Sequence, residues 1–239
     1  MGRGPSIEGR KNAEDARKAK VFTKLIREIT IAARGGADPA GNARLRAGID
    51  KALAANMTKD TIERAVRRGS GADGADNMQE LRYEGYGPSG VALIIDAMTD
   101  NAQRTVADVR HALAKHGGNL GTSGSVAFQF HRLGEIVVDT SKPGSDDKVL
   151  EIALDAGADD VQTEAAQTTV LTSADSIEAV KKALVAAGFI PARADVVMRP
   201  ENRVAVSDEI AETLRDLIDW LEELDDVQDV YHNATLPSA

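Results

Sequence analysis

The 239-residue sequence contains no cysteine and few aromatic residues. Without cysteine the chain cannot form a disulfide, a thiolate nucleophile or a zinc–thiolate site. This absence fits a reducing compartment, and we predict a cytoplasmic location. Aromatic residues make up 3% of the chain, so its cores must be built mainly from Val, Ile, Leu and Ala.

Long apolar runs are also missing from the sequence. The longest aliphatic run, Val91 to Ile95, is far too short to span a bilayer. The N-terminal stretch MGRGPSIEGRK lacks the apolar centre of a signal peptide. We therefore predict that the protein has no membrane association.

The net charge of −9 hides a segregation of the two signs along the chain. Residues 1–70 hold 16 Lys and Arg against 8 Asp and Glu, whereas residues 71–239 hold 13 against 30. A basic N-terminal region on an acidic body favours an anionic partner, with nucleic acid as the main candidate. A basic helical surface that only faces solvent is the alternative.

Three helices are expected in the first 70 residues. Apolar residues recur at helical spacing from Arg17 to Arg34, and Gly35-Gly36 predicts the end of this helix. Asp38-Pro39 predicts the start of a second helix that reaches about Ala55. A third helix is expected from about Lys59 to Arg68, closed by Gly69. Beside the apolar face of the first helix lies a basic stripe: Arg17, Lys20, Lys24, Arg27 and Arg34.

The remaining sequence predicts two α/β domains after a linker, Gly69–Asn77. From residue 135 to 198 the expected order is strand, helix, strand, strand, helix, strand, which is the ferredoxin-like βαββαβ arrangement. Residues 91–131, with an expected last strand at 125–131, combine with 203–231 to suggest a second such unit. The predicted fold is α+β: a basic helical domain (1–76), a discontinuous α+β middle domain (77–132 plus 201–239) and an inserted ferredoxin-like domain (133–200).

Two segments could bind phosphate. A phosphate-binding glycine loop follows a strand and opens a helix, whereas KHGGNLGTSGSV (115–126) follows a helix and enters a strand. We interpret it as a helix cap and turn. The segment DAMTDNAQRT (96–105) ends a strand and starts a helix with Arg104 in its first turn, but Asp100 would repel an anion. Plain N-capping is the favoured interpretation of that segment.

The sequence gives little support for a catalytic site or a metal site. His111 and His116 point about 140° apart on an ideal helix, which is wrong for shared ligation. Ser123 and Ser125 lack the context of a nucleophile. The acidic stretch WLEELDDVQD (220–229) is interpreted as a solvated face. We predict that the protein is not an enzyme and uses no metal, cofactor or small-molecule substrate.

The βαββαβ order is also that of the RRM, which recognises RNA through aromatic residues on its sheet. Phe128 and Phe130 are expected on one strand, on the same face as Val126, which favours burial over base stacking. The strands of the inserted domain carry no aromatic residue. Neither unit is predicted to be an RRM.

Several segments together resemble the YebC/PmpR-like proteins, a family that includes the mitochondrial translational activator of cytochrome oxidase. They are KVFTKLIREITIAAR (20–34), NARLRAGIDKALAANM (42–57), IERAVRRG (62–69), RYEGYGPSGVALIIDAMTDN (82–101), RTVADVRHALAKHGGNLGTSGSVAF (104–128) and AVKKALVAAGF (179–189). The resemblance implies a helical domain followed by two α/β domains. Many members begin with a GHSKW-type segment, which is replaced by GRGPSIEGRKN here, so contacts made by that segment cannot be transferred.

The resemblance implies binding to nucleic acid rather than catalysis. Our leading hypothesis is a cytoplasmic DNA-binding transcriptional regulator. The alternative is a ribosome-associated translation factor that binds ribosomal RNA and relieves stalls at proline-rich stretches. A scaffold that binds only protein is a third class. The residues predicted to contact nucleic acid are Arg10, Lys11, Arg17, Lys20, Lys24, Arg27, Arg34, Arg44, Arg46, Arg64, Arg67 and Arg68.

Overall fold

The computed structural model describes residues 7–74 and 77–237, and for residues 7–14 it describes only the helical backbone. The chain divides into two compact units. Unit 1 holds the described residues up to Ser125, Val206–Val230 and the residues from Leu236 onward. Unit 2 holds Val126–Ala205 and Tyr231–Thr235.

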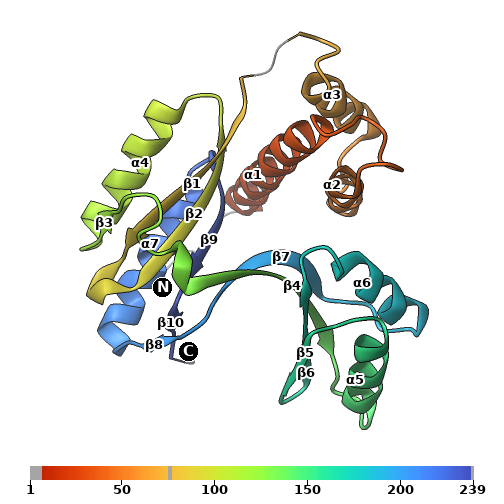
Figure 1. The fold of residues 1–239 in the computed structure, drawn as a ribbon. Coiled ribbons are helices and arrows are strands. Elements are labelled where there is room, and N and C mark those ends of the chain that lie inside the picture. Colours follow the sequence, from red (N-terminus) through yellow and green to blue (C-terminus); the bar gives the residue numbers. More distant parts are fainter. Residues whose placement is uncertain (1–6, 75–76, 238–239) are drawn as a thin grey trace. The chain divides into compact units, whose positions relative to one another are not determined.

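Unit 1 begins with three helices, α1 (Ile7–Ala33), α2 (Ala43–Ala54) and α3 (Lys59–Gly69), as expected (Figure 1). The second helix begins later than predicted. Asp38 Oδ1 accepts a hydrogen bond from the Ala40 amide in a turn, and Asn42 caps α2 by accepting from the Leu45 amide. Thr58 caps α3 in the same way.

The three helices share an apolar core that contains residues of these helices and their connections. Its buried members are Ile29, Ala32, Ala33, Leu45, Ala52, Met57, Ile62 and Ala65, with Phe22, Leu25, Ile26, Ile49 and Val66 packed against them. Phe22 is the one aromatic side chain in this set, as expected from a composition poor in aromatics. One face of α1 is thus used for packing within the helical part.

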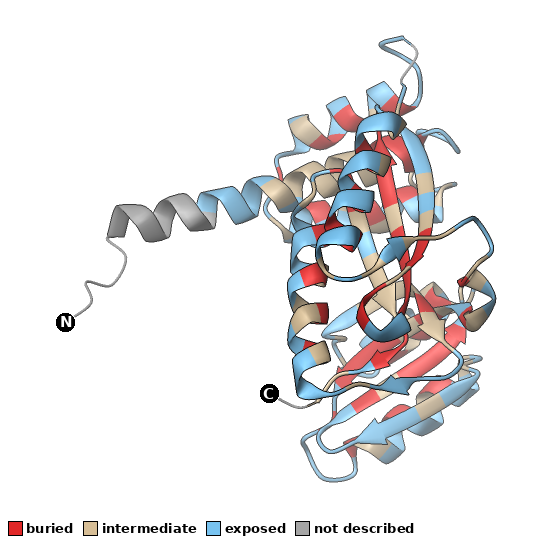
Figure 2. Ribbon diagram, turned by 90° about the vertical axis from the view of Figure 1, so that its left-hand side faces the viewer, coloured by how far each residue is buried: buried red, intermediate tan, exposed pale blue. Residues whose placement is uncertain are grey.

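The rest of unit 1 is a four-stranded sheet with two helices. Strands β1 (Gln79–Tyr86) and β2 (Ala92–Thr99) form an antiparallel hairpin through the turn η1 (Pro88–Gly90), and the strand order is β3-β1-β2-β9. After β2 the chain forms α4 (Ala102–Lys115) and β3 (Asn119–Leu120), and after the elements of unit 2 it forms α7 (Asp208–Glu223) and β9 (Val227–His232). α4 contacts both α7 and the hairpin. β2 is buried along nearly its whole length, consistent with its central place (Figure 2).

Unit 2 confirms the ferredoxin-like prediction. Its elements are β4 (Phe130–Asp139), α5 (Ser145–Asp155), β5 (Asp160–Glu164), β6 (Gln167–Ser173), α6 (Ile177–Ala186) and β7 (Arg193–Pro200). The antiparallel sheet has the order β5-β6-β4-β7, and its core is built from aliphatic residues of the sheet and both helices. Two short strands, β8 (Val204–Ala205) and β10 (Ala234–Thr235), pair in parallel.

The α+β class is confirmed, but the expected strand at 125–131 is wrong. Residues Ala127–Gln129 form a 3-10 turn (η2), and Phe130 begins β4, which pairs with β7 of unit 2. The middle sheet instead obtains its edge strand from β3, so it does not have the predicted βαββαβ order. The turn also breaks strand alternation: Phe130 is 5% exposed, whereas Phe128 is 73% exposed rather than buried. The three-domain division at 76, 132 and 200 stays a prediction.

No helix among the described residues is long and apolar enough to cross a membrane.

Candidate nucleic-acid interface

The predicted basic residues fall into two groups on the helical part of unit 1. The side chains of Arg10 and Lys11 lie outside the described residues. Lys20, Lys24 and Arg27 on α1 are partly buried. The side chains that face solvent are Arg17, Arg34, Arg44, Arg46, Arg64, Arg67 and Arg68.

The partly buried group contacts the corner where α7 leads into β9. Lys20 Nζ lies 3.4 Å from a carboxylate oxygen of Glu223, and Lys24 Nζ donates to the backbone carbonyl of Gln228 at 3.4 Å. One turn further along α1, Arg27 reaches Asp226. We call these three side chains and their partners the α1 contact.

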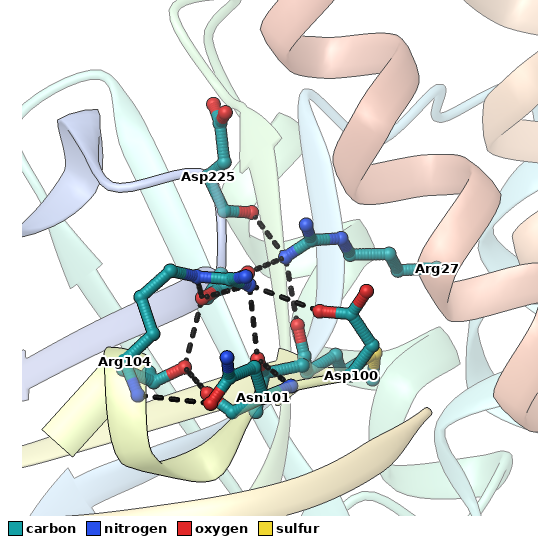
Figure 3. Close-up of polar contacts among 9 residues, drawn as sticks. Arg27, Asp100, Asn101, Arg104 and Asp225 are labelled. Atoms are coloured by element: carbon teal, nitrogen blue, oxygen red, sulfur yellow. Dashed lines mark hydrogen bonds and ion pairs between the residues drawn. The ribbon is translucent and has the colours of Figure 1, made fainter. Parts of the chain in front are cut away.

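Arg27 is deeply placed for a charged residue, with 15% of its side chain exposed. Its Nη1 donates to Asp226 Oδ1 at 2.7 Å, to the Met98 carbonyl at 2.7 Å and to the Asp225 carbonyl at 2.6 Å. Figure 3 shows the side chains of Arg27 and Arg104 pointing toward one another from α1 and α4. Arg27 therefore joins the end of β2 and the start of β9 to the helical part.

Asp226 receives donors from α4 as well. Arg104 Nη2 donates to Asp226 Oδ2 at 2.9 Å and Thr105 Oγ1 donates to the same oxygen at 2.8 Å. Burial by itself raises the pKa of Asp226, but the hydrogen bonds from Thr105, Arg104 and Arg27 outweigh it and hold the pKa below its usual value. We call Arg27, Arg104, Thr105 and Asp226 the Asp226 cluster.

The Asp226 cluster shows whether the segment 96–105 is arranged to bind phosphate or only to cap α4. Asn101 caps α4 by accepting from the Arg104 amide at 3.1 Å, so the favoured N-capping interpretation is confirmed. The anion beside the first turn of this helix is the protein's own carboxylate, Asp226, which is 5% exposed. The interpretation of 220–229 as a solvated face is therefore wrong for Asp226, although Asp225 next to it is exposed.

A cleft of about 540 Å³ adjoins the cluster and does not suit a phosphate. Its ionisable lining comprises two arginines, Arg27 and Arg104, against five carboxylates: Asp100, Asp108, Glu223, Asp225 and Asp226. Both guanidinium groups already pair with carboxylates there. Repulsion by the remaining carboxylates would disfavour an anionic ligand.

The exposed arginines of α3 form a different kind of surface. Arg64, Arg67 and Arg68 are spaced three and four residues apart, and all three are exposed. The opposite side of α3 is buried through Ile62, Ala65 and Gly69. This packing fixes which face of the helix is turned to solvent, so the helix presents three guanidinium groups on one side.

The local partners of these arginines are weak or exposed. Arg64 donates within its own helix to the Asp60 carbonyl at 3.3 Å and to Thr61 Oγ1 at 3.2 Å. Arg67 pairs with the exposed Asp73 at 2.8 Å, and this pair raises the pKa of Arg67. Exposed ion pairs of this type contribute little to stability, and their side chains readily exchange one partner for another.

The two predicted arginines of α2 differ from each other. Arg44 pairs with Glu28 of α1 at 2.7 Å and also with Glu80 of β1, and these pairs hold its pKa above the usual value. Arg46 donates to the Pro39 carbonyl at 3.0 Å in the loop before α2. Arg44 is therefore neutralised locally, whereas Arg46 keeps its charge at the surface.

The glycine stretch 115–126 runs from α4 through β3, in the predicted helix-to-strand direction. Its amides contact the protein itself: Gly121 donates to the Glu84 carbonyl at 2.8 Å and Gly124 donates to the Glu84 side chain at 2.7 Å. Gly118 lies so close to β1 that a Cβ there would approach the Tyr86 carbonyl oxygen to 2.2 Å. These contacts support its interpretation as a turn.

Among the described residues no group of three or more His, Cys, Asp and Glu side chains could hold a metal ion. His111 and His116 contact the same side chain, which the sequence did not indicate. Both rings pack edge-on against Trp220 of α7, with centroid distances of 5.8 and 5.4 Å. Only the packing of α4 on α7 brings these three residues together.

Comparison with known proteins identifies related chains over nearly the whole length. A family model described as the TACO1/YebC protein N-terminal domain matches residues 4–72, and one described as the TACO1/YebC second and third domain matches residues 78–234. A probable transcriptional regulatory protein of Xanthomonas campestris pv. campestris (strain B100) is 55% identical, covering 98% of this chain and 97% of the relative.

Two further relatives agree with these matches. A probable transcriptional regulatory protein of Stenotrophomonas maltophilia (strain K279a) is 53% identical over 99% of this chain and 98% of its own. The crystal structure of a conserved hypothetical protein from Aquifex aeolicus superposes with a TM-score of 0.85 at 42% identity. It covers 94% of this chain and 93% of the relative.

Proposed function

Because the chain belongs to the TACO1/YebC family, we propose that it is a nucleic-acid-binding regulator of gene expression and acts as a DNA-binding transcriptional regulator. Its bacterial relatives are named as probable transcriptional regulatory proteins, which supports regulation rather than catalysis. The observation that carries the proposal is the exposed arginine face of α3, formed by Arg64, Arg67 and Arg68.

The proposed interface is centred on α3. Arg46, Arg34 and Arg17 add exposed positive charge elsewhere on the helical part, and the predicted Arg10 and Lys11 precede them in sequence. Lys20, Lys24, Arg27 and Arg44 already have protein acceptors, so each would have to exchange that partner for a phosphate. Phosphate contacts give affinity without sequence information, and such binding weakens steeply with salt.

A charge reversal on α3 tests the proposal. The double variant Arg64→Glu/Arg68→Glu removes two exposed guanidinium groups. We expect at least about tenfold weaker binding to a DNA duplex and a salt dependence reduced by about two phosphate contacts. Fluorescence anisotropy over a salt series measures both quantities.

The matched control is Lys142→Glu/Lys148→Glu, which makes the same charge change at exposed positions of unit 2. It should keep the salt dependence of the unsubstituted protein. If Arg64→Glu/Arg68→Glu binds DNA as tightly as the control variant does, and RNA as tightly as well, the α3 arginines are only a solvated surface. Crosslinking the protein in cells then distinguishes the two roles. Crosslinks to promoter DNA support the transcriptional role, and crosslinks to ribosomal RNA support the translation-factor alternative.

A further inference from the structure

The α1 contact places predicted nucleic-acid ligands against carboxylates of the same chain. Lys20 pairs with Glu223 and Arg27 pairs with Asp226, while Lys24 donates to the Gln228 carbonyl. A guanidinium or ammonium group engaged in this way has fewer donors left for a phosphate, and the neighbouring carboxylates repel one. The α7–β9 corner therefore competes with nucleic acid for these three side chains.

The α1 contact is polar, and this makes it reversible. The apolar core of the helical part is closed among its own residues, so α1 can leave the corner without opening that core. Salt screens ion pairs and anions compete for their cations, whereas neither effect weakens the burial of apolar surface. The outermost pair, Lys20 with Glu223, is largely exposed on the carboxylate side and contributes little by itself.

Asp226 is arranged so that Arg27 can leave it. A buried carboxylate that loses its only partner is costly. Here Asp226 also accepts hydrogen bonds from Arg104 and Thr105, both of which lie on α4 and stay beside it when α1 moves. The cost of releasing Arg27 is lowered by these two remaining donors.

We propose that the α1 contact is an autoinhibitory contact: the α7–β9 corner occupies Lys20, Lys24 and Arg27 until the phosphate backbone of a nucleic acid displaces it. This inference rests on the proposed function and adds its regulation. In the closed state the α3 arginines make the first encounter. Release of α1 then adds three cations to the interface.

Two measurements test this device, and the natural lack of cysteine makes the first one direct. Ala54→Cys on α2 and Ala114→Cys on α4 are exposed positions of unit 1 that can carry spin labels. Electron–electron distance measurements should give a narrow distribution for the free protein. Addition of a DNA duplex, or of salt alone, should shift it to longer and broader distances.

The second measurement compares neighbouring carboxylates of α7. Glu223→Gln removes the partner of Lys20, whereas Glu222→Gln makes the same charge change at an exposed neighbour and is the matched control. We expect Glu223→Gln to bind DNA about two- to fivefold tighter than Glu222→Gln. Asp226→Asn should have a larger effect, about tenfold, and should lengthen the label distance without DNA.

The outcomes separate the inference from the function on which it rests. If DNA binds but Glu223→Gln and Asp226→Asn match Glu222→Gln in affinity and label distance, autoinhibition is overturned and the proposed function stands. If Arg64→Glu/Arg68→Glu binds like the unsubstituted protein, the α3 interface is overturned, while tighter binding by Glu223→Gln would still support the device. If no nucleic acid binds any variant, both are overturned.

Discussion

At the scale of single residues, Asp226 shows how burial and charge combine in this protein. It is 5% exposed and accepts hydrogen bonds from Arg27, Arg104 and Thr105. The arginines stay charged throughout the pH range in which a carboxyl group titrates. The ionised form of Asp226 is therefore the form that the folded protein stabilises.

This arrangement predicts a pH-dependent contribution of Asp226 to stability. Its pKa is lower in the folded protein than in the unfolded chain, so its contribution is fully present above about pH 4, the ordinary value for Asp. The contribution is lost as pH falls through the lower, folded-state pKa. At neutral pH, Asp226→Asn should lower the free energy of unfolding by about 3 kcal/mol.

Denaturant unfolding of both proteins from neutral to acidic pH measures the difference. The gap should be flat above about pH 5 and should shrink below about pH 4. A gap that widens as pH falls through 6 and 5 would mean that burial wins and the pKa is raised, because the folded protein would then bind the proton more tightly than the unfolded chain. A gap that stays constant to the most acidic pH would mean that the contact is not ionic.

The sequence could not identify Asp226 as the central residue. In WLEELDDVQD it stands beside Asp225, which has the same side chain and is exposed. Its partners Arg104 and Arg27 are more than a hundred residues away in the chain, and the packing of α4 and α1 beside the α7–β9 corner brings them together. Local pattern separates helix from strand but not one carboxylate from its neighbour.

At the scale of elements, periodicity predicted most helices because their apolar faces are regular. α3 follows its expected range and α1 ends where expected, although α1 begins at Ile7 rather than near Arg17. Caps such as Asn42, Thr58 and Ser207 mark three helix starts. Periodicity failed at 125–131, where a 3-10 turn interrupts an apparent strand. It also could not show which side of α1 meets the α7–β9 corner, since that depends on residues 223–228.

The crossing of α1 and α3 predicts a specific role for Gly69. A Cβ at this position would lie 1.9 Å from the carbonyl oxygen of Thr30 and 2.7 Å from its carbonyl carbon, both backbone atoms of α1. The helices would have to separate, and the small core of the helical part would loosen. Gly69→Ala should therefore lower the free energy of unfolding of unit 1 by about 3 kcal/mol.

Gly41→Ala provides the matched control, because the nearest atom to a Cβ there is the Asp38 carbonyl oxygen at 4.0 Å. This substitution should change stability by less than about 1 kcal/mol. Chemical denaturation followed by far-ultraviolet circular dichroism compares the two variants. Equal stability of Gly69→Ala and Gly41→Ala would contradict the close approach of α1 and α3.

At the scale of the whole molecule, the helical core of unit 1 and the core of unit 2 are separate sets of residues. The helical core of unit 1 is built around Ile29 and Leu45, and the core of unit 2 around Val180 and Leu184. A chain with independent cores does not have to unfold in one step. The sequence could predict this division in part, because the βαββαβ order is local to one stretch of chain.

Separate cores predict at least two unfolding transitions in scanning calorimetry. Leu45 and Leu184 are each fully buried, one in each unit, so replacement by alanine should cost about 2–5 kcal/mol at either site. Leu45→Ala should lower the midpoint of one transition and Leu184→Ala that of another, since each cavity weakens only the core that contains it. The two substitutions match in chemistry and burial, so each serves as the control for the other. A single transition shifted equally by both would mean that the units unfold as one cooperative body, and the domain division read from the sequence would then lack a thermodynamic counterpart.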